Sequence, residues 1–325
     1  MTDVLLIGIG TTTLSALKSL TAKCNVVGVV RNVNTELNDD PVVSVAQQLG
    51  IQIFSDTSQK QIKSLILRFK PDCVVVSSYN QILPSELITL STFVNVHYSP
   101  LPHYRGRANV NWAMINDEPS AAITIHQISS ELDEGNILFQ QLISIGFEDT
   151  IASLYDKLNE IQFQNLGETV MSLLNGDQGF PQNNAEATYC CTRLPEDGEI
   201  NWSVSTRSID CFIRALVPPF PGAYTYFQQQ KMLIWQAKPV NNPPKYVGRI
   251  PGRVIGRSKS EGYVDVLTGD GVLRILQVQL EGEEKTAAAN IVKSVKSTLG
   301  LQMSDLLNRI QILAEQINKL KKNAK

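Results

Sequence analysis

The first half of the chain alternates short apolar runs with segments of helical periodicity, and this alternation limits the possible folds more than any other feature. Strands are predicted at 4–9, 26–30, 51–53, 73–76 and 92–96, and helices at 14–20, 43–49 and 59–69. In a strand–helix–strand order, the helices cover the faces of a parallel sheet. We therefore predict an α/β domain with a mostly parallel, Rossmann-like sheet flanked by helices.

Two polar residues end the last of these apolar runs. Asn95 and His97 lie two apart on the predicted strand, so they share a face at the carboxyl edge, where open parallel sheets bind ligands. Asn can donate to an oxyanion, His can move a proton near neutral pH, and Asp133 downstream can orient that His. These roles suit acyl transfer to an amine. Spacing alone equally allows ordinary loop hydrogen bonds and an Asp-x-Gly turn.

A longer ordered set of motifs surrounds these residues. It comprises Asn95-x-His97-x-Ser99, Leu101-Pro102, Tyr104-Arg105-Gly106, Trp112, Ile123-Thr124-Ile125-His126, Asp133-x-Gly135, Asp197-Gly198-Glu199-Ile200-Asn201-Trp202 and Pro221-Gly222-Ala223. The set resembles the folate-dependent formyltransferase family in its two-domain form. The resemblance covers most of the chain and implies a formyltransferase fold followed by a small open β-barrel, similar to an OB-fold.

The resemblance also implies the catalytic residues, the formyl donor and the residues that bind the substrates. Asn95, His97 and Asp133 fall on the family's catalytic positions, and 10-formyltetrahydrofolate would be the formyl donor. The folate pocket would include the loop residues Tyr79, Gln81, Ile82, Leu83 and Pro84, which offer apolar surface for a pterin ring. Acceptor contacts are expected from Ser99, Arg105 and Arg107, because guanidinium groups match phosphate and carboxylate oxygens; pairing with nearby loop carboxylates is the alternative for the two arginines.

Composition shifts along the chain predict its organisation. We expect a catalytic domain at 1–178, a polar linker at 179–201, a β-barrel domain at 202–300 and an amphipathic helical tail at 301–325. In the tail, apolar residues from Met303 to Leu320 recur at spacings of three and four. This helix could dock on the chain itself, mediate a homodimer, or lead to a fused or docked partner.

Composition and charge exclude several classes. With 29 basic and 31 acidic residues the chain has a net charge of −2, so nucleic acid is not an expected partner. Its five cysteines contain no Cys-x-x-Cys pair and it has only three histidines, so no metal site is expected. No apolar stretch is long enough to span a bilayer, and we expect a cytoplasmic enzyme.

The acceptor is predicted less directly. The segment 31–40 is acidic where methionyl-tRNA formyltransferases typically carry a basic loop, and the tracts 104–112 and 218–224 look closer to sugar-nucleotide N-formyltransferases. Asn109 departs from the Pro common in those relatives. We predict formylation of a small primary amine, best an amino sugar nucleotide. The alternatives are methionyl-tRNA, the start of a peptide-assembly line, hydrolysis of the formyl-folate, and a non-catalytic folate- or nucleotide-binding module.

Overall fold

The computed structural model describes residues 2–32 and 40–323, and leaves the side chains of residues 304, 305, 322 and 323 undescribed. Most of the acidic segment predicted at 31–40 therefore lies outside the described residues. The chain divides into two compact units: one comprises residues 1–113 and 118–192, and the other comprises residues 114–117 and 193–325.

Unit 1 is built on a seven-stranded sheet in the order β3-β2-β1-β4-β5-β7-β8. Its strands are β1 (Asp3–Ile7), β2 (Asn25–Val30), β3 (Ile53–Phe54), β4 (Cys73–Ser77), β5 (Thr92–His97), β7 (Ser120–Gln127) and β8 (Ile137–Ser144). The first five are parallel, and β7 and β8 continue the sheet antiparallel. The predicted mostly parallel sheet is confirmed.

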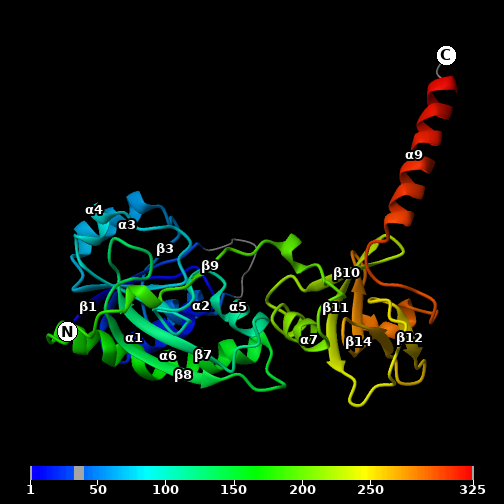
Figure 1. The fold of residues 1–325 in the computed structure, drawn as a ribbon. Coiled ribbons are helices and arrows are strands. Elements are labelled where there is room, and N and C mark those ends of the chain that lie inside the picture. Colours follow the sequence, from blue (N-terminus) through cyan, green and yellow to red (C-terminus); the bar gives the residue numbers. More distant parts are fainter. Residues whose placement is uncertain (1, 33–39, 324–325) are drawn as a thin grey trace. The chain divides into compact units, whose positions relative to one another are not determined.

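Helices cover both faces of this sheet. The helices in this part of the chain are α1 (Thr13–Thr21), α2 (Pro41–Gln48), α3 (Gln59–Phe69), α4 (Ser85–Ile88), α5 (Asn109–Ile115) and α6 (Ile151–Leu174). Helices α1 and α6 pack together on one face, and α3 and α4 lie over the other (Figure 1). Gly167 lets α6 approach α1 closely, because a Cβ there would lie 2.6 Å from the carbonyl oxygen of Ser19.

The face under α3 sets the orientation of the functional strand. Ile62, Leu65 and Ile66 of α3 form one buried cluster with alternate residues of the central strands, among them Phe93 of β5. Because side chains on a strand alternate between faces, Asn95 and His97 continue the side to which Phe93 belongs. They lie beyond the apolar core, at the carboxyl end of β5.

The remaining elements connect and complete the chain. The short strands β6 (Arg105–Gly106) and β9 (Tyr189–Cys190) pair with each other in unit 1, and one-turn helices occur at Asn184–Glu186 and Pro195–Gly198. Unit 2 holds an antiparallel sheet in the order β10-β11-β14-β13-β12, with β15 beside β14. Its strands are β10 (Ala223–Phe227), β11 (Gln230–Pro239), β12 (Val254–Arg257), β13 (Val264–Leu267), β14 (Val272–Leu280) and β15 (Thr286–Ala287), with helices α7 (Thr206–Arg214) and α8 (Ala288–Ile291).

The tail forms helix α9 (Met303–Asn323), and its apolar stripe is exposed. Ile310 is 63% exposed and Leu320 is 69% exposed. Docking of this stripe on the chain itself, on a second copy or on another partner stays a prediction. None of the described helices combines the length and apolarity that crossing a membrane requires.

Candidate active site

Two histidine side chains and one carboxamide, those of His97, His126 and Asn95, meet where β5 pairs with β7. In this antiparallel pair Asn95 lies opposite His126, and His97 lies opposite Thr124. The imidazole rings of His97 and His126 meet edge to face, with centroids 6.2 Å apart. His97 and His126 are both buried, whereas Asn95 is half-buried.

His126 is held neutral, and its hydrogen bonds define its tautomer. Burial is the largest influence on its pKa, which is lowered to about 4, although the Asp133 carboxylate acts in the opposite direction. Its Nδ1 lies 2.8 Å from the backbone oxygen of Gln127, which can only accept, so Nδ1 carries the hydrogen. Nε2 is then an acceptor, and it receives a hydrogen bond of 3.1 Å from Nδ2 of Asn95. This bond turns the amide of Asn95 so that its donor side faces the cluster.

Asp133 brings a carboxylate between the two rings. Its Oδ2 lies 3.6 Å from Nδ1 of His97 and its Oδ1 lies 3.7 Å from Nε2 of His126. The same carboxylate accepts a 2.9 Å hydrogen bond from the backbone N–H of Gly106 and a longer one, 3.5 Å, from Nδ2 of Asn95. The structure thus brings the three residues predicted to be catalytic into one polar cluster.

The turn that carries Asp133 is shaped by its neighbours. Asp133 has a φ of 52°, an unusual value for a non-glycine residue. A Cβ at Gly135 would lie 1.9 Å from the carbonyl oxygen of Gln127, so only glycine fits where the turn passes β7. Gln182 supports the turn by donating to the backbone oxygens of Asp133 and Gly135, at 2.7 and 2.8 Å. The Asp-x-Gly motif therefore aims the carboxylate at the strand ends.

His97 is engaged on its other nitrogen by the loop that follows β5. Its Nε2 lies 3.0 Å from the backbone oxygen of Tyr104 and 2.9 Å from Nδ2 of Asn109. The Asn109 amide also donates to the backbone oxygens of Tyr104 and Gly106, at 3.1 and 3.0 Å. The ring of His97 is therefore fixed from both sides, by Asp133 at Nδ1 and by this loop at Nε2.

The predicted folate loop follows β4, the parallel neighbour of β5, at the same edge of the sheet. Ile82 is 78% exposed, Gln81 is exposed, and Leu83 and Pro84 are half-buried. Tyr79 packs against the core and donates from its hydroxyl to the backbone oxygen of Thr57 at 2.8 Å. Within this loop, Ile82 offers the largest uncovered apolar side chain.

The three predicted acceptor residues have different environments. Ser99 is buried and its hydroxyl donates to the backbone oxygen of His103 at 2.9 Å. Arg105 is 1% exposed, and its Nη2 donates to the side-chain oxygens of Gln182 and Asn184, at 2.8 and 2.6 Å.

Arg107, by contrast, is exposed. Among the residues that the structure describes, none forms an ion pair or hydrogen bond with its guanidinium. Of the two arginines proposed for acceptor binding, Arg107 is the one whose guanidinium has no partner among the described residues.

Three residues of the cluster were not singled out for function from the sequence. His126 lies directly opposite Asn95, but this became visible only with the antiparallel register of β5 and β7. Asn109 drew attention only as a departure from proline. Gln182 lies in the predicted linker, where a polar, Asn-rich composition gives no sign of a contact with the Asp133 turn.

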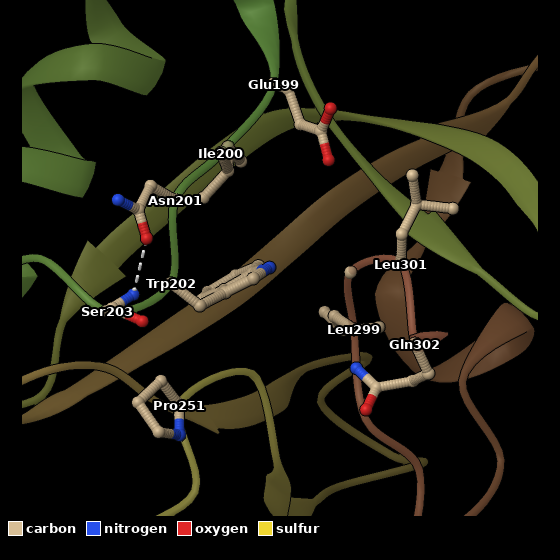
Figure 2. A pocket seen from close by; sticks show the side chains of 10 residues that line it. Glu199, Ile200, Asn201, Trp202, Ser203, Pro251, Leu299, Leu301 and Gln302 are labelled. Carbon is tan, nitrogen blue, oxygen red and sulfur yellow. Dashed lines mark hydrogen bonds between the residues drawn. The ribbon is translucent and has the colours of Figure 1, made fainter. Parts of the chain in front are cut away.

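A separate cavity of about 430 Å³ lies in unit 2 (Figure 2). Its lining includes Trp202, Pro251 and Leu301, and none of the predicted site residues. Two of its polar side chains are paired: Asn201 accepts from the backbone N–H of Ser203, and the indole of Trp202 donates to Thr225. The described residues also contain no group of His, Cys, Asp and Glu side chains suited to a metal ion. The residues predicted to be catalytic therefore lie in the cluster of unit 1 and not in this cavity.

Comparison with known proteins identifies the family of the chain. The family model of the formyl transferases matches residues 10–170, and the model of the formyl transferase C-terminal domain matches residues 194–296. The methionyl-tRNA formyltransferase of Caldanaerobacter subterraneus subsp. tengcongensis is 36% identical over 252 residues, which cover 75% of this chain and 79% of the relative.

Two solved structures share the fold. HypX from Aquifex aeolicus, in complex with tetrahydrofolic acid, has a TM-score of 0.65 at 18% identity, over 90% of this chain and 47% of that one. The sugar 3N-formyl transferase WlaRD, solved with dTDP and 5-N-formyl-THF, has a TM-score of 0.64 at 19% identity, over 87% and 99%. The resemblance drawn from the sequence motifs is thereby confirmed. The chain belongs to the formyl transferase family, whose members are folate-dependent enzymes that take the formyl group from 10-formyltetrahydrofolate.

Proposed function

We propose that this protein transfers a formyl group from 10-formyltetrahydrofolate to the primary amine of a small anionic acceptor, best an amino sugar nucleotide. The observation that carries the proposal is the cluster of Asn95, His97 and Asp133 at the carboxyl edge of the sheet, in a chain of this family. Beside it the loop with Ile82 offers exposed apolar surface for the donor's ring system, and Arg107 offers an exposed cation for an acceptor phosphate.

Asn95 stabilises the charge that develops on the formyl oxygen. Its Nδ2 donates one hydrogen to the neutral Nε2 of His126, at an N···N distance of 3.1 Å. The other hydrogen points toward Oδ1 of Asp133 at 3.5 Å, which is the limit of a hydrogen bond. The weakly held hydrogen is the one available to an oxyanion. A donor of this kind lowers the barrier by about 3 kcal/mol.

His97 moves the proton that the attacking amine loses. An imidazole can accept this proton near neutral pH and return it to the leaving nitrogen of the folate. The carboxylate of Asp133, 3.6 Å from Nδ1, stabilises the imidazolium that forms in between. Asp133 is itself kept in place by the backbone N–H of Gly106.

Methionyl-tRNA is the second candidate acceptor. It is favoured by the methionyl-tRNA formyltransferase relatives, which include that of Alkaliphilus oremlandii, 32% identical over 77% of this chain. A tRNA carries a polyanionic backbone, and the net charge of −2 over the whole chain offers it no general attraction. The small acceptor fits the charge balance better.

The test is tetrahydrofolate release and formylated product, measured with purified full-length chain and 10-formyltetrahydrofolate. The acceptors are dTDP- and UDP-linked amino sugars, methionyl-tRNA and free amino acids, with one reaction lacking an acceptor. We expect product only with an amino sugar nucleotide. Product with methionyl-tRNA alone would establish the second candidate, and release of formate without an acceptor would identify a hydrolase. Absence of turnover on the whole panel would overturn the proposal.

A further inference from the structure

Asn109, at the start of α5, contacts the nitrogen of His97 that does not face Asp133. Its Nδ2 lies within 3.1 Å of three atoms: Nε2 of His97 and the backbone oxygens of Tyr104 and Gly106. We propose that Asn109 is a positioning residue that keeps Nε2 of His97 protonated, so that the proton exchanged in the reaction is carried by Nδ1. The inference rests on the proposed role of His97 and adds a residue that this role requires.

The orientation of the Asn109 amide follows from its neighbours. Backbone oxygens only accept hydrogen bonds, so a side-chain oxygen facing Tyr104 and Gly106 would meet two acceptors. The amide nitrogen must therefore point toward them, and its two hydrogens go to the two carbonyl oxygens. No amide hydrogen is then left for Nε2 of His97.

The protonation of Nε2 follows in turn. Nε2 lies 3.0 Å from the backbone oxygen of Tyr104, which already accepts from Asn109. A bare Nε2 would place a lone pair against that oxygen, whereas an Nε2–H donates to it. The neutral ring is therefore the Nε2–H tautomer, and the nitrogen left to accept a proton is Nδ1, which faces the Asp133 carboxylate at 3.6 Å.

The position of the Tyr104 carbonyl depends on the conformation of its turn, so the turn needs Asn109 to hold it. Tyr104 and Ala108 both have a φ of 59°, in the left-handed region that non-glycine residues rarely adopt. Asn109 ties two carbonyls of this turn together. Without that tie, the nearby Asp133 carboxylate would draw the hydrogen of neutral His97 to Nδ1. A protonated Nδ1 could not accept a proton from an amine.

The experiment determines the tautomer of His97 from ¹⁵N chemical shifts in the full-length chain, without substrates and at a pH where the ring is neutral. We expect a protonated Nε2 and a bare Nδ1 in the unaltered protein. In Asn109→Ala we expect the hydrogen to move to Nδ1, with kcat/KM at least about tenfold lower at an unchanged KM for the folate, since a wrong tautomer is costly in catalysis.

Thr188→Val is the matched control. The Thr188 hydroxyl accepts a 2.9 Å hydrogen bond from the backbone N–H of Tyr104, so it braces the same turn without touching His97. We expect this variant to keep the Nε2–H tautomer. The same tautomer change in both variants would reduce Asn109 to a brace of the turn and overturn the proposal.

A bare Nε2 in the unaltered protein would overturn the proposal even if no variant folds. Because the tautomer is read without substrates, it is independent of the acceptor panel. Failure of the formyl-transfer assay and failure of this inference are therefore distinguishable.

Discussion

Replacing His126 tests whether a neutral imidazole is buried beneath the site. Its pKa, lowered to about 4 by burial, lies below the value of about 6.5 expected in the unfolded chain. Between these two values the unfolded chain binds a proton that the folded chain does not. Stability is therefore lost as the pH falls from about 6.5 to about 4 and does not change further below that range.

The magnitude follows from the two pKa values. At pH 5 the unfolded state gains about 2 kcal/mol from protonating this residue, while the folded state gains almost nothing. His126→Gln removes the titrating group and leaves a side-chain oxygen that can accept from Asn95. We expect the unaltered protein to lose about 2 kcal/mol more than this variant between pH 7.5 and pH 5.

Hydrogen exchange of peptides from β5 and β7 is the appropriate assay, because it reports the opening of unit 1 separately from unit 2. The comparison uses the pH slope rather than the absolute stability, since losing the bond to Asn95 will itself destabilise the variant. His103→Gln is the control, because His103 lies outside the cluster and its removal should leave the slope intact. Equal slopes in the unaltered protein and His126→Gln would refute the argument, as would a His126 pKa near 6.5 measured by NMR titration.

Three further predictions concern the kinetic constants kcat and KM. Asn95→Ala should lower kcat by about 100-fold or more, whereas Asn165→Ala, which removes an equally half-buried carboxamide from α6, should not; near-normal turnover in Asn95→Ala would rule out its role. Arg107→Ala should raise KM about tenfold for an anionic acceptor and leave the folate KM unchanged; a loss that is the same for uncharged amines would argue against phosphate contact. Ile82→Ser should raise the folate KM by about tenfold, from the lost apolar contact, and an unchanged KM would place the pterin elsewhere.

Periodicity was sufficient to predict the parallel part of the fold. Helix α3 was predicted with the bounds that the structure gives it, because a capping Ser58 and a clear apolar stripe define it locally. Helix α6 also has a local start signal, because it begins after Thr150, whose hydroxyl accepts from the N–H of Ser153. The strands β7 and β8 were not predicted as antiparallel neighbours, since pairing direction depends on contacts between distant segments.

The candidate site divides in the same way. The sequence by itself determined that Asn95 and His97 share one side of a strand, because alternation along a strand is a local property of the backbone. It also singled out Asp133, from the chemistry of a carboxylate and from motif resemblance rather than from geometry.

Only the tertiary structure decided the partners of these residues. It placed His126 opposite Asn95 and brought Asn109 to His97. It also buried Arg105 and Ser99, with hydrogen bonds inside the chain, and left Arg107 exposed. Burial and charge pairing are sums over neighbours from separate segments. A residue's identity defines what it can donate, accept or titrate, and the fold decides which of these capacities is already satisfied and which remains for a substrate.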